Sequence, residues 1–399
     1  MRFPPAFYQI EREIVSRFPD LRPSQHAWLS LWVFGMFQAH SGTESAVLAA
    51  LSSYGNPDAL RQRLREGLKD GGDRAAPCSV ELEVSACFPL LFAWVLALWQ
   101  GETLPLALDA SLLGDELVVL AVCVLYRGGS IPVAWAVRPA NTPDEWLPRW
   151  EALLESLLSA FHSALPRRLR RREVVVMTDR GLWSPVLWDR LVASGWHPLM
   201  RLHPEITFRP SGRERRKVRE WLRGPGHAFL ARGVAFGKKG RQREATLVAS
   251  WETGEAEPWV LLTDLPPDPT VLRWYGLRSW IEAGFRSLKS MGWQWDKTRR
   301  RDPKRVERHW LAMAVAQLWV LACGTREEDA REVGVPPERL RTPPSVEGKV
   351  RRTVSLWRRG LASLGKQCLR GGLWKRLWLS PEPWPDPPFL IPSRLVCIT

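Results

Sequence analysis

Paired cysteines are missing from this sequence, and its first residues are not expected to act as a secretory leader. Its six cysteines form no CxxC pair and stand near no histidine pattern, so neither a zinc site nor a disulfide framework is expected, and a reducing compartment fits. The first residues, MRFPPAFYQIEREIV, include acidic residues and no apolar h-region. The longest apolar run, residues 87–99, is too short to cross a bilayer and predicts a buried helix. We therefore expect a cytoplasmic protein without a membrane partner.

Lysine is also scarce, because only 10 of the 57 basic residues are lysine and the other 47 are arginine. The chain of 399 residues has a formal net charge of +15 and a pI near 10.1, which indicates a polyanionic partner. The planar guanidinium group of arginine binds phosphate with two hydrogen bonds, so the bias suits nucleic acid. A GC-rich genome accounts for the same bias equally well. A membrane surface is a competing partner, but no amphipathic anchor stands apart from the other basic residues.

The order of the expected elements indicates an α/β protein with an RNase H-like mixed sheet flanked by helices. Residues 1–100 have apolar side chains at helical spacing and predict a helical N-terminal region. Three strands joined by short turns follow, and then a helix, a strand, a helix and a strand; the ranges are 104–110, 116–126, 130–137, 144–165, 174–179, 184–194 and 196–202. Hairpins make the first three strands antiparallel, and helical crossovers make the later ones parallel.

Two aspartates fall where such a sheet would place its chemistry. Asp109 lies in the first strand, within LPLALDASLL, and Asp179 ends the fourth strand, in VVVMTDRGL. If these strands are central neighbours, the two carboxylates converge at adjacent positions. Asp179 could instead cap the following turn, which is a common role for aspartate. Asp109 could be a strand residue that reaches solvent, although a charge inside an apolar strand needs a partner or a metal ion.

A polar motif with regular spacing lies further along the chain. In YGLRSWIEAGFRSLK the residues Tyr275, Arg278, Glu282 and Lys289 are separated by three, four and seven positions, which places them on one side of a single helix. The apolar residues of the segment lie on the other faces. A solvated helix surface with ion pairs is the simpler interpretation of this spacing.

The motif Tyr-x2-Arg-x3-Glu-x6-Lys resembles the C-terminal catalytic block of one branch of the DDE transposases, the bacterial cut-and-paste transposases of insertion sequence family four. LALDAS around Asp109, MTDRGLW around Asp179 and PWVLLTDLP at 258–266 occur in the order of that family. The similarity covers residues 100–325. The resemblance implies an RNase H-like catalytic core in which Asp109, Asp179 and Glu282 form the catalytic, metal-binding triad.

The resemblance also implies roles for the cofactor and for the other motif residues. Three carboxylates would hold two Mg²⁺ or Mn²⁺ ions, since these hard cations prefer oxygen ligands. Tyr275, Arg278 and Lys289 would hold the DNA strand near the scissile phosphate. Trp259 would stack on a base flipped from the element end, although core packing is an equal alternative. Arg180 is a further candidate for phosphate binding.

Composition and the resemblance together divide the chain into five regions. We expect a helical N-terminal region for binding DNA ends, a catalytic core in two parts separated by a β-rich basic insertion, and a basic, tryptophan-rich and largely helical C-terminal region for DNA contact or dimerisation; the ranges are 1–100, 101–202, 203–258, 259–324 and 325–399. Basic runs at 213–223, 297–308 and 345–379 favour contact with a phosphate backbone.

The expected function is that of a DNA transposase. Such a protein binds the terminal inverted repeats of its element, joins two ends in a homodimer, cleaves double-stranded DNA, and transfers the strands to target DNA. It would act in the bacterial cytoplasm, associated with the nucleoid. An RNase H-like nuclease or resolvase without strand transfer is the enzymatic alternative. A domesticated DNA-binding protein is the alternative without enzymatic activity.

Overall fold

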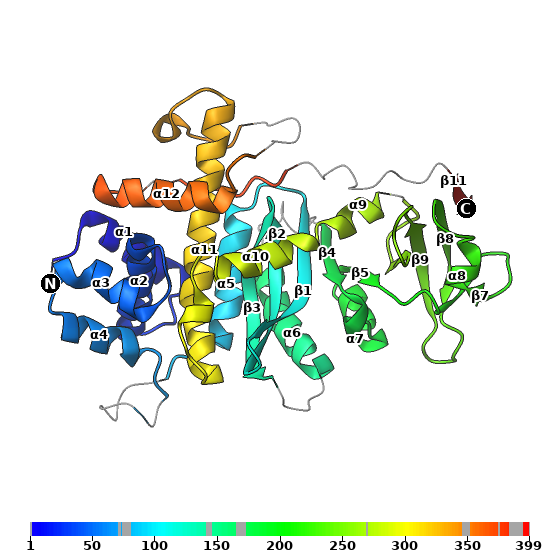
Figure 1. Ribbon diagram of the computed structural model, residues 1–399, viewed down its shortest axis with the longest axis horizontal. Coiled ribbons are helices and arrows are strands. Elements are labelled where there is room, and N and C mark those ends of the chain that lie inside the picture. Colours follow the sequence, from blue (N-terminus) through cyan, green and yellow to red (C-terminus); the bar gives the residue numbers. More distant parts are fainter. Residues whose placement is uncertain are drawn as a thin grey trace.

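The computed structural model describes residues 2–70, 73, 81–140, 146–164, 173–268, 270–344, 352–373, 376–382 and 394–398; for 146–147, 159–164 and 394–398 it describes the backbone alone. The molecule is elongated, with N-terminal helices at one end, the central part of a large sheet in the middle, and further strands at the other end (Figure 1). The outermost residues of the helix expected at 144–165, namely 144, 145 and 165, lie outside the described residues.

The expected helical N-terminal region is present as five helices. Their bounds are α1 Pro5–Arg17, α2 Pro23–Ala39, α3 Glu44–Leu51, α4 Pro57–Glu66 and α5 Phe88–Leu98. Proline opens α1, α2 and α4, a position where its missing N–H costs no hydrogen bond. Helix α5 is the buried helix expected from the apolar run at 87–99, and most of its side chains are in the core.

The central strands have the order expected of an RNase H-like sheet. The order is β3-β2-β1-β4-β5; β1 runs antiparallel to β2 and parallel to β4, and β5 runs parallel to β4. Their bounds are β1 Thr103–Leu113, β2 Leu117–Tyr126, β3 Gly129–Pro139, β4 Glu173–Thr178 and β5 His197–Arg201. Helices α6 (Trp146–Ala164) and α7 (Pro185–Ala193) form the crossovers. The fold class inferred from sequence is therefore confirmed.

The insertion extends this sheet and does not form a sheet of its own. Strand β10 pairs antiparallel with β5, and β9, β8, β6 and β7 follow it outward. The bounds are β6 Thr207–Pro210, β7 Arg216–Lys217, α8 Val218–Trp221, β8 His227–Ala235, β9 Arg243–Trp251 and β10 Trp259–Thr263. The last described strand, β11 Arg394–Ile398, lies parallel to β8. One hydrogen-bonded sheet thus connects the core rigidly to the far end of the molecule (Figure 1).

The polar motif does not lie on a single helix, so that expectation was wrong. Helix α9 (Val271–Gly276) ends before Arg278, and α10 (Ser279–Leu288) begins after it. The amide of Arg278 donates to Tyr275 O, and the amide of Ile281 donates to Arg278 O; both bonds span three residues. A tighter turn of this kind rotates the side chains relative to a continuous α-helix. The α-helical hydrogen bonding is therefore interrupted at the arginine of the motif, although the backbone dihedral angles of Leu277 and Arg278 stay helical.

A long helix joins the N-terminal region to the sheet. Helix α11 (Pro303–Glu332) spans 30 residues and contacts α2, α12 (Leu356–Leu369) and β3. Helices α11 and α12 approach closely because Gly360 has no side chain; a Cβ there would lie 1.8 Å from Val320 O. Within the described part of the chain, no helix combines the length and the apolar character needed to cross a membrane.

The pairing of β5 with β10 carries a histidine–aspartate contact that should make folding stability pH-dependent. His197 Nδ1 lies 3.1 Å from Asp264 Oδ2, and this hydrogen bond, opposed by partial burial, raises the pKa of His197 above 6.5. The stabilisation is therefore complete below about pH 6.5 and is lost as the pH rises through the folded-state pKa. We expect the destabilisation caused by His197→Gln to shrink between about pH 6 and pH 8 in urea unfolding.

The exposed His203 supplies the matched control, because His203→Gln removes a histidine from the same part of the chain. Parallel pH profiles for the two variants would contradict the role given to the Asp264 contact.

Candidate active site

The register of two central strands places Asp109 and Asp179 side by side. Strand β1 pairs with β4 up to Leu108 and Thr178, so the next residue on each strand is an aspartate. Asp109 Oδ1 accepts from the following backbone amide at 2.8 Å. Asp179 Oδ1 accepts from the amide of Gly181 at 2.6 Å, so this aspartate also caps the turn that follows it. The two expected carboxylates therefore meet at one edge of the sheet.

Glu282 reaches the same edge from helix α10, which lies across β1, β2 and β3 (Figure 1). The helix buries Ile281, Phe285 and Leu288 against the sheet and leaves the Glu282 side chain 62% exposed. Gly284 permits the close approach, since a Cβ there would lie 1.8 Å from Ser130 Oγ and 2.9 Å from the Ser130 amide nitrogen. The missing side chain at 284 thus sets how far the glutamate extends over the strand ends.

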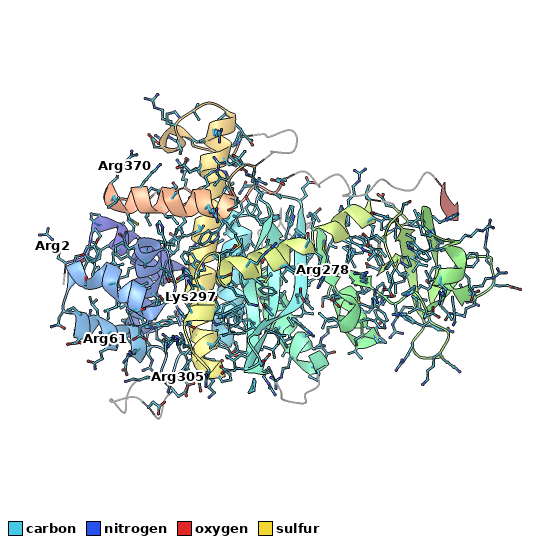
Figure 2. All side chains as sticks on the ribbon, viewed as in Figure 1. Arg2, Arg61, Arg278, Lys297, Arg305 and Arg370 are labelled. Atoms are coloured by element: carbon cyan, nitrogen blue, oxygen red, sulfur yellow. The ribbon has the colours of Figure 1, made fainter. Side chains whose placement is uncertain are left out.

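The guanidinium group of Arg278 lies among the three carboxylates. Arg278 Nη2 is 3.0 Å from Asp109 Oδ2 and 3.4 Å from Asp179 Oδ2, and Nη1 is 3.8 Å from Glu282 Oε1. Its side chain is only 14% exposed. Figure 2 shows this arginine in the middle of the molecule, where α9 and α10 meet above the sheet. One positive charge faces three negative ones, so the cluster keeps a net charge of −2 when all are ionised.

Burial of Asp109 is the main electrostatic feature of the cluster. Desolvation raises the pKa of Asp109, and the charge of Arg278 and the backbone amide of Ala110 oppose that rise. The arginine therefore keeps a half-buried acid available in its charged form. Such a perturbed carboxylate beside a second one is typical of a functional site.

The donor chemistry of the cluster fits a hard divalent cation. Within the described residues, no three His, Cys, Asp or Glu side chains are grouped closely enough to hold a metal ion as they stand. The three acids already share one cation, Arg278, and contribute oxygen donors only. Mg²⁺ and Mn²⁺ prefer such ligands and retain water, so two or three carboxylates suffice. An ion would require Arg278 to move away from at least part of the cluster.

The remaining motif residues contact the backbone of the strands that bear the aspartates. Tyr275 is buried, its hydroxyl donates to Thr178 O at 3.3 Å, and desolvation raises its pKa to about 12. Lys289 Nζ donates to Leu112 O at 2.5 Å, and partial burial lowers the pKa of Lys289. Both side chains thus hold the motif helices against the strand ends.

Trp259 contacts a residue of the motif, whereas Arg180 pairs with an acid outside the carboxylate cluster. Trp259 is partly buried at the start of β10, and its ring meets that of Tyr275 edge to face at 5.1 Å between centroids. Arg180 pairs with Glu257 at 2.6 Å, and among the described residues no ion pair joins it to the three acids. Arg201 was missed by sequence reasoning; its guanidinium lies over the Trp259 ring at 5.8 Å. Its only sequence signal is its place at the end of a central strand.

The sheet order and the paired acids define a chain of the RNase H-like class. A family model described as the transposase DDE domain matches residues 120–319, which is half of the sequence. The chain belongs to this DDE transposase family. No curated protein matches the chain. The match includes Asp179 and Glu282 but begins after Asp109, so Asp109 is connected to the site by the strand register. The narrower assignment to insertion sequence family four stays a prediction.

The ion pair at the centre of the site predicts a specific pattern of stability. Arg278→Leu removes the cation that faces the half-buried Asp109 and should lower the free energy of unfolding by about 1–3 kcal/mol. The double variant Asp109→Asn/Arg278→Leu should recover most of this loss, since the half-buried charge at 109 is then absent and the two acids that still lose their partner, Asp179 and Glu282, are more exposed. Urea unfolding measures the free energy of unfolding of the single and the double variant.

The exposed Arg286 on the same helix provides the control, and Arg286→Leu should change stability by no more than about 0.5 kcal/mol. A double variant that is no more stable than Arg278→Leu would show that the two side chains are not paired.

Proposed function

We propose that this transposase binds the terminal inverted repeats of its own element, cleaves double-stranded DNA at their ends, and joins the exposed strands to target DNA. The convergence of Asp109, Asp179 and Glu282 on one guanidinium group is the observation that carries the proposal. Carboxylates from two adjacent strands and a helix make one small, negatively charged site. A site of that kind suits displacement at phosphorus, because it can hold cations that neutralise a phosphodiester.

The three carboxylates are proposed to hold two Mg²⁺ or Mn²⁺ ions, which stabilise the attacking and leaving oxygens when bound. Asp109 is fixed by its own strand and by the Ala110 amide, and Asp179 by the Gly181 amide, so both acids present their Oδ2 atoms to the cluster. Glu282, on the exposed side, completes the set. The fixed aspartates set the position, and the exposed glutamate can adjust to it.

The basic and aromatic side chains around the acids are proposed to bind the DNA strand. Arg278 can bind two phosphate oxygens once the carboxylates no longer hold it, and Lys289 adds a point charge from the end of α10. Tyr275 can donate its hydroxyl. Arg180, directly after Asp179 in the chain, is proposed as a further phosphate contact, and Trp259 is proposed to stack on a base flipped from the element end.

Several wider features of the function rest on the family resemblance. We propose that two copies of the chain form a homodimer that pairs two element ends. The N-terminal helices and the C-terminal region would contribute to binding the ends or to dimerisation. The place of action would be the bacterial cytoplasm, with the protein associated with the nucleoid.

Incubation with a DNA fragment that carries the element ends, in the presence of Mg²⁺, tests the proposal directly. Denaturing gels should show cleavage at the ends and, with target DNA added, joined molecules. Cleavage without joining would favour an RNase H-like nuclease or resolvase. Binding without cleavage would favour a domesticated DNA-binding protein.

Substitution of the acids should separate chemistry from binding. Asp109→Ala, Asp179→Ala and Glu282→Ala should each reduce cleavage by about 10³-fold or more, since each removes several kcal/mol of transition-state stabilisation. Affinity for duplex DNA, measured by fluorescence anisotropy, should change little.

Glu257 is the matched control, because it is an exposed acid near the site that pairs with Arg180 and lies outside the cluster. Glu257→Ala should keep cleavage. Near-normal cleavage by any of the three cluster variants would remove that residue from the catalytic set.

Trp259 allows base stacking and core packing to be distinguished. If it stacks on a flipped base, Trp259→Ala should leave the first nick nearly unchanged and block a later step such as hairpin formation, because stacking contributes about 1–3 kcal/mol per base. Trp259→Phe should restore part of that step. A time course of nicked, hairpin and fully cleaved products, run beside thermal melts, measures this.

Trp251 on the neighbouring strand β9 is the packing control, since it is also partly buried against the core. Trp251→Ala should lower stability without changing the ratio of products. If Trp259→Ala behaves in the same way, then Trp259 is a packing residue.

A further inference from the structure

The three basic runs of the sequence have different structural roles. In the run 297–308, Arg300, Arg305 and Arg308 pair with acidic side chains of the N-terminal region, and Arg308 is 2% exposed. The acidic partners are Glu44, Asp73 and Asp70. Much of this run therefore fastens the N-terminal helices to α11 and is not available to a polyanion.

In the C-terminal run the described tryptophans are internal, whereas most of the described basic side chains, including Arg358, Lys366, Arg370 and Arg376, are exposed. Arg352 forms an ion pair with the buried Glu328, Trp357 is buried on α12, and Trp378 donates to Asp329 Oδ2 at 2.7 Å. Trp374, the third tryptophan of that run, lies outside the described residues. These aromatic side chains pack the C-terminal segment onto α11.

The first part of the insertion is strongly basic. Residues 205–243 contain 12 basic and three acidic residues, a net charge of +9 out of +15 for the whole sequence. Only one of the acids, Glu205, is shared by two basic side chains, those of Lys217 and Arg219. Four further acids lie between 244 and 257, so the whole insertion, 203–258, has a net charge of +5, and its positive charge is concentrated in the part before β9.

A groove at that end is lined by arginine and aromatic side chains. Its volume is 1180 Å³, and its lining includes Arg209, Arg213, Arg216, Arg223, Trp221 and His227. Arg216 lies over the Trp221 ring at 5.6 Å and has a loose ion pair with Glu214 at 3.7 Å. Among the described residues, Arg209, Arg213 and Arg223 form no ion pair, and all three are exposed. The lining also includes Glu214 and Glu220, so the groove presents four guanidinium groups against two carboxylates.

We propose that this groove, which we call the insertion groove, binds the phosphate backbone of duplex DNA away from the carboxylate cluster. The proposal rests on the proposed function, since it assigns a second contact with the same DNA. Four strand-to-strand steps separate β4 from β8, or roughly 19 Å at about 4.8 Å per step. Duplex DNA rises about 3.4 Å per base pair, so the groove would contact backbone about six base pairs from the bond being cut.

Duplex DNA fits the groove better than a flat anionic surface does. The groove is concave, and the strands beside it are hydrogen-bonded to the core sheet; Arg209 and Arg216 lie on β6 and β7, and Arg213 and Arg223 lie in the adjoining turn and loop. A rigid polyanion with regular charges benefits from such an array, and arginine forks bind phosphate oxygens in pairs. The groove would add affinity and orientation without reading base sequence.

The salt dependence of duplex binding tests the proposal. Arg213→Gln/Arg223→Gln should lower the slope of log affinity against log salt by about 2 between about 50 and 200 mM salt, since each phosphate contact contributes about 0.9. Anisotropy with the full chain and a duplex of about 30 base pairs, long enough to cover both sites, provides the measurement.

Lys217→Gln/Arg219→Gln is the matched control. It removes the same charge from the same insertion, but both side chains are already paired with Glu205. Its slope should equal that of the unaltered protein. Thermal melts establish that both double variants are folded.

Three results would overturn the proposal. The first is an unchanged slope for Arg213→Gln/Arg223→Gln, and the second is an equal fall for the control, which would indicate a diffuse charge effect. The third is that Arg213→Gln/Arg223→Gln loses binding to anionic lipid vesicles while its binding to duplex DNA stays intact. Cleavage is not needed for this test, and Asp109→Ala should give the slope of the unaltered protein. A reduced slope in a protein that never cleaves DNA would support the groove and contradict the transposition function.

Discussion

The ion pairing of Arg278 with three carboxylates is the interaction on which the site depends. Like charges on adjacent strands repel each other, and a cation between them offsets that repulsion while the site is built. Two strands, a helix and the turn between α9 and α10 must all be in place before the four groups can meet. The arginine thus links correct folding of distant segments to the assembly of an acidic site, and it leaves enough negative charge to attract cations.

The second constraint is the continuity of the sheet. Strand β10 pairs with β5, so the insertion is joined to the catalytic strands by backbone hydrogen bonds and not by a flexible linker. Trp259 begins that strand and meets Tyr275 of the motif, which connects the insertion to the candidate active site. A duplex that contacts both the carboxylates and the insertion groove would therefore meet two sites joined by one sheet. The long helix α11 gives the N-terminal helices a similar attachment on the other side.

Buried charge explains why basic composition alone did not locate a DNA surface. Arg127 pairs with Glu328 and Asp329 in the interior, and Arg308 is buried against the N-terminal region. Their acidic partners are remote in sequence, so a count along the chain assigns these arginines to solvent. Only the folded structure shows which basic side chains are neutralised inside and which, as in the insertion groove, remain open.

The order of strands and helices, the family and the acids were readable from the sequence, because alternating apolar runs and hairpin turns are local signals and the spaced motif is specific. The placement of Asp109 beside Asp179 followed from the same strand order. The break between α9 and α10 was not readable, since the residue spacing also suits one helix and the turn is decided by packing of α10 on β3, where Gly284 meets Ser130. The extension of the sheet by the insertion, and the contact of Arg278 with all three acids, depend on pairings between segments far apart in the chain. Local patterns carry no information about such pairings, so the tertiary structure decided them.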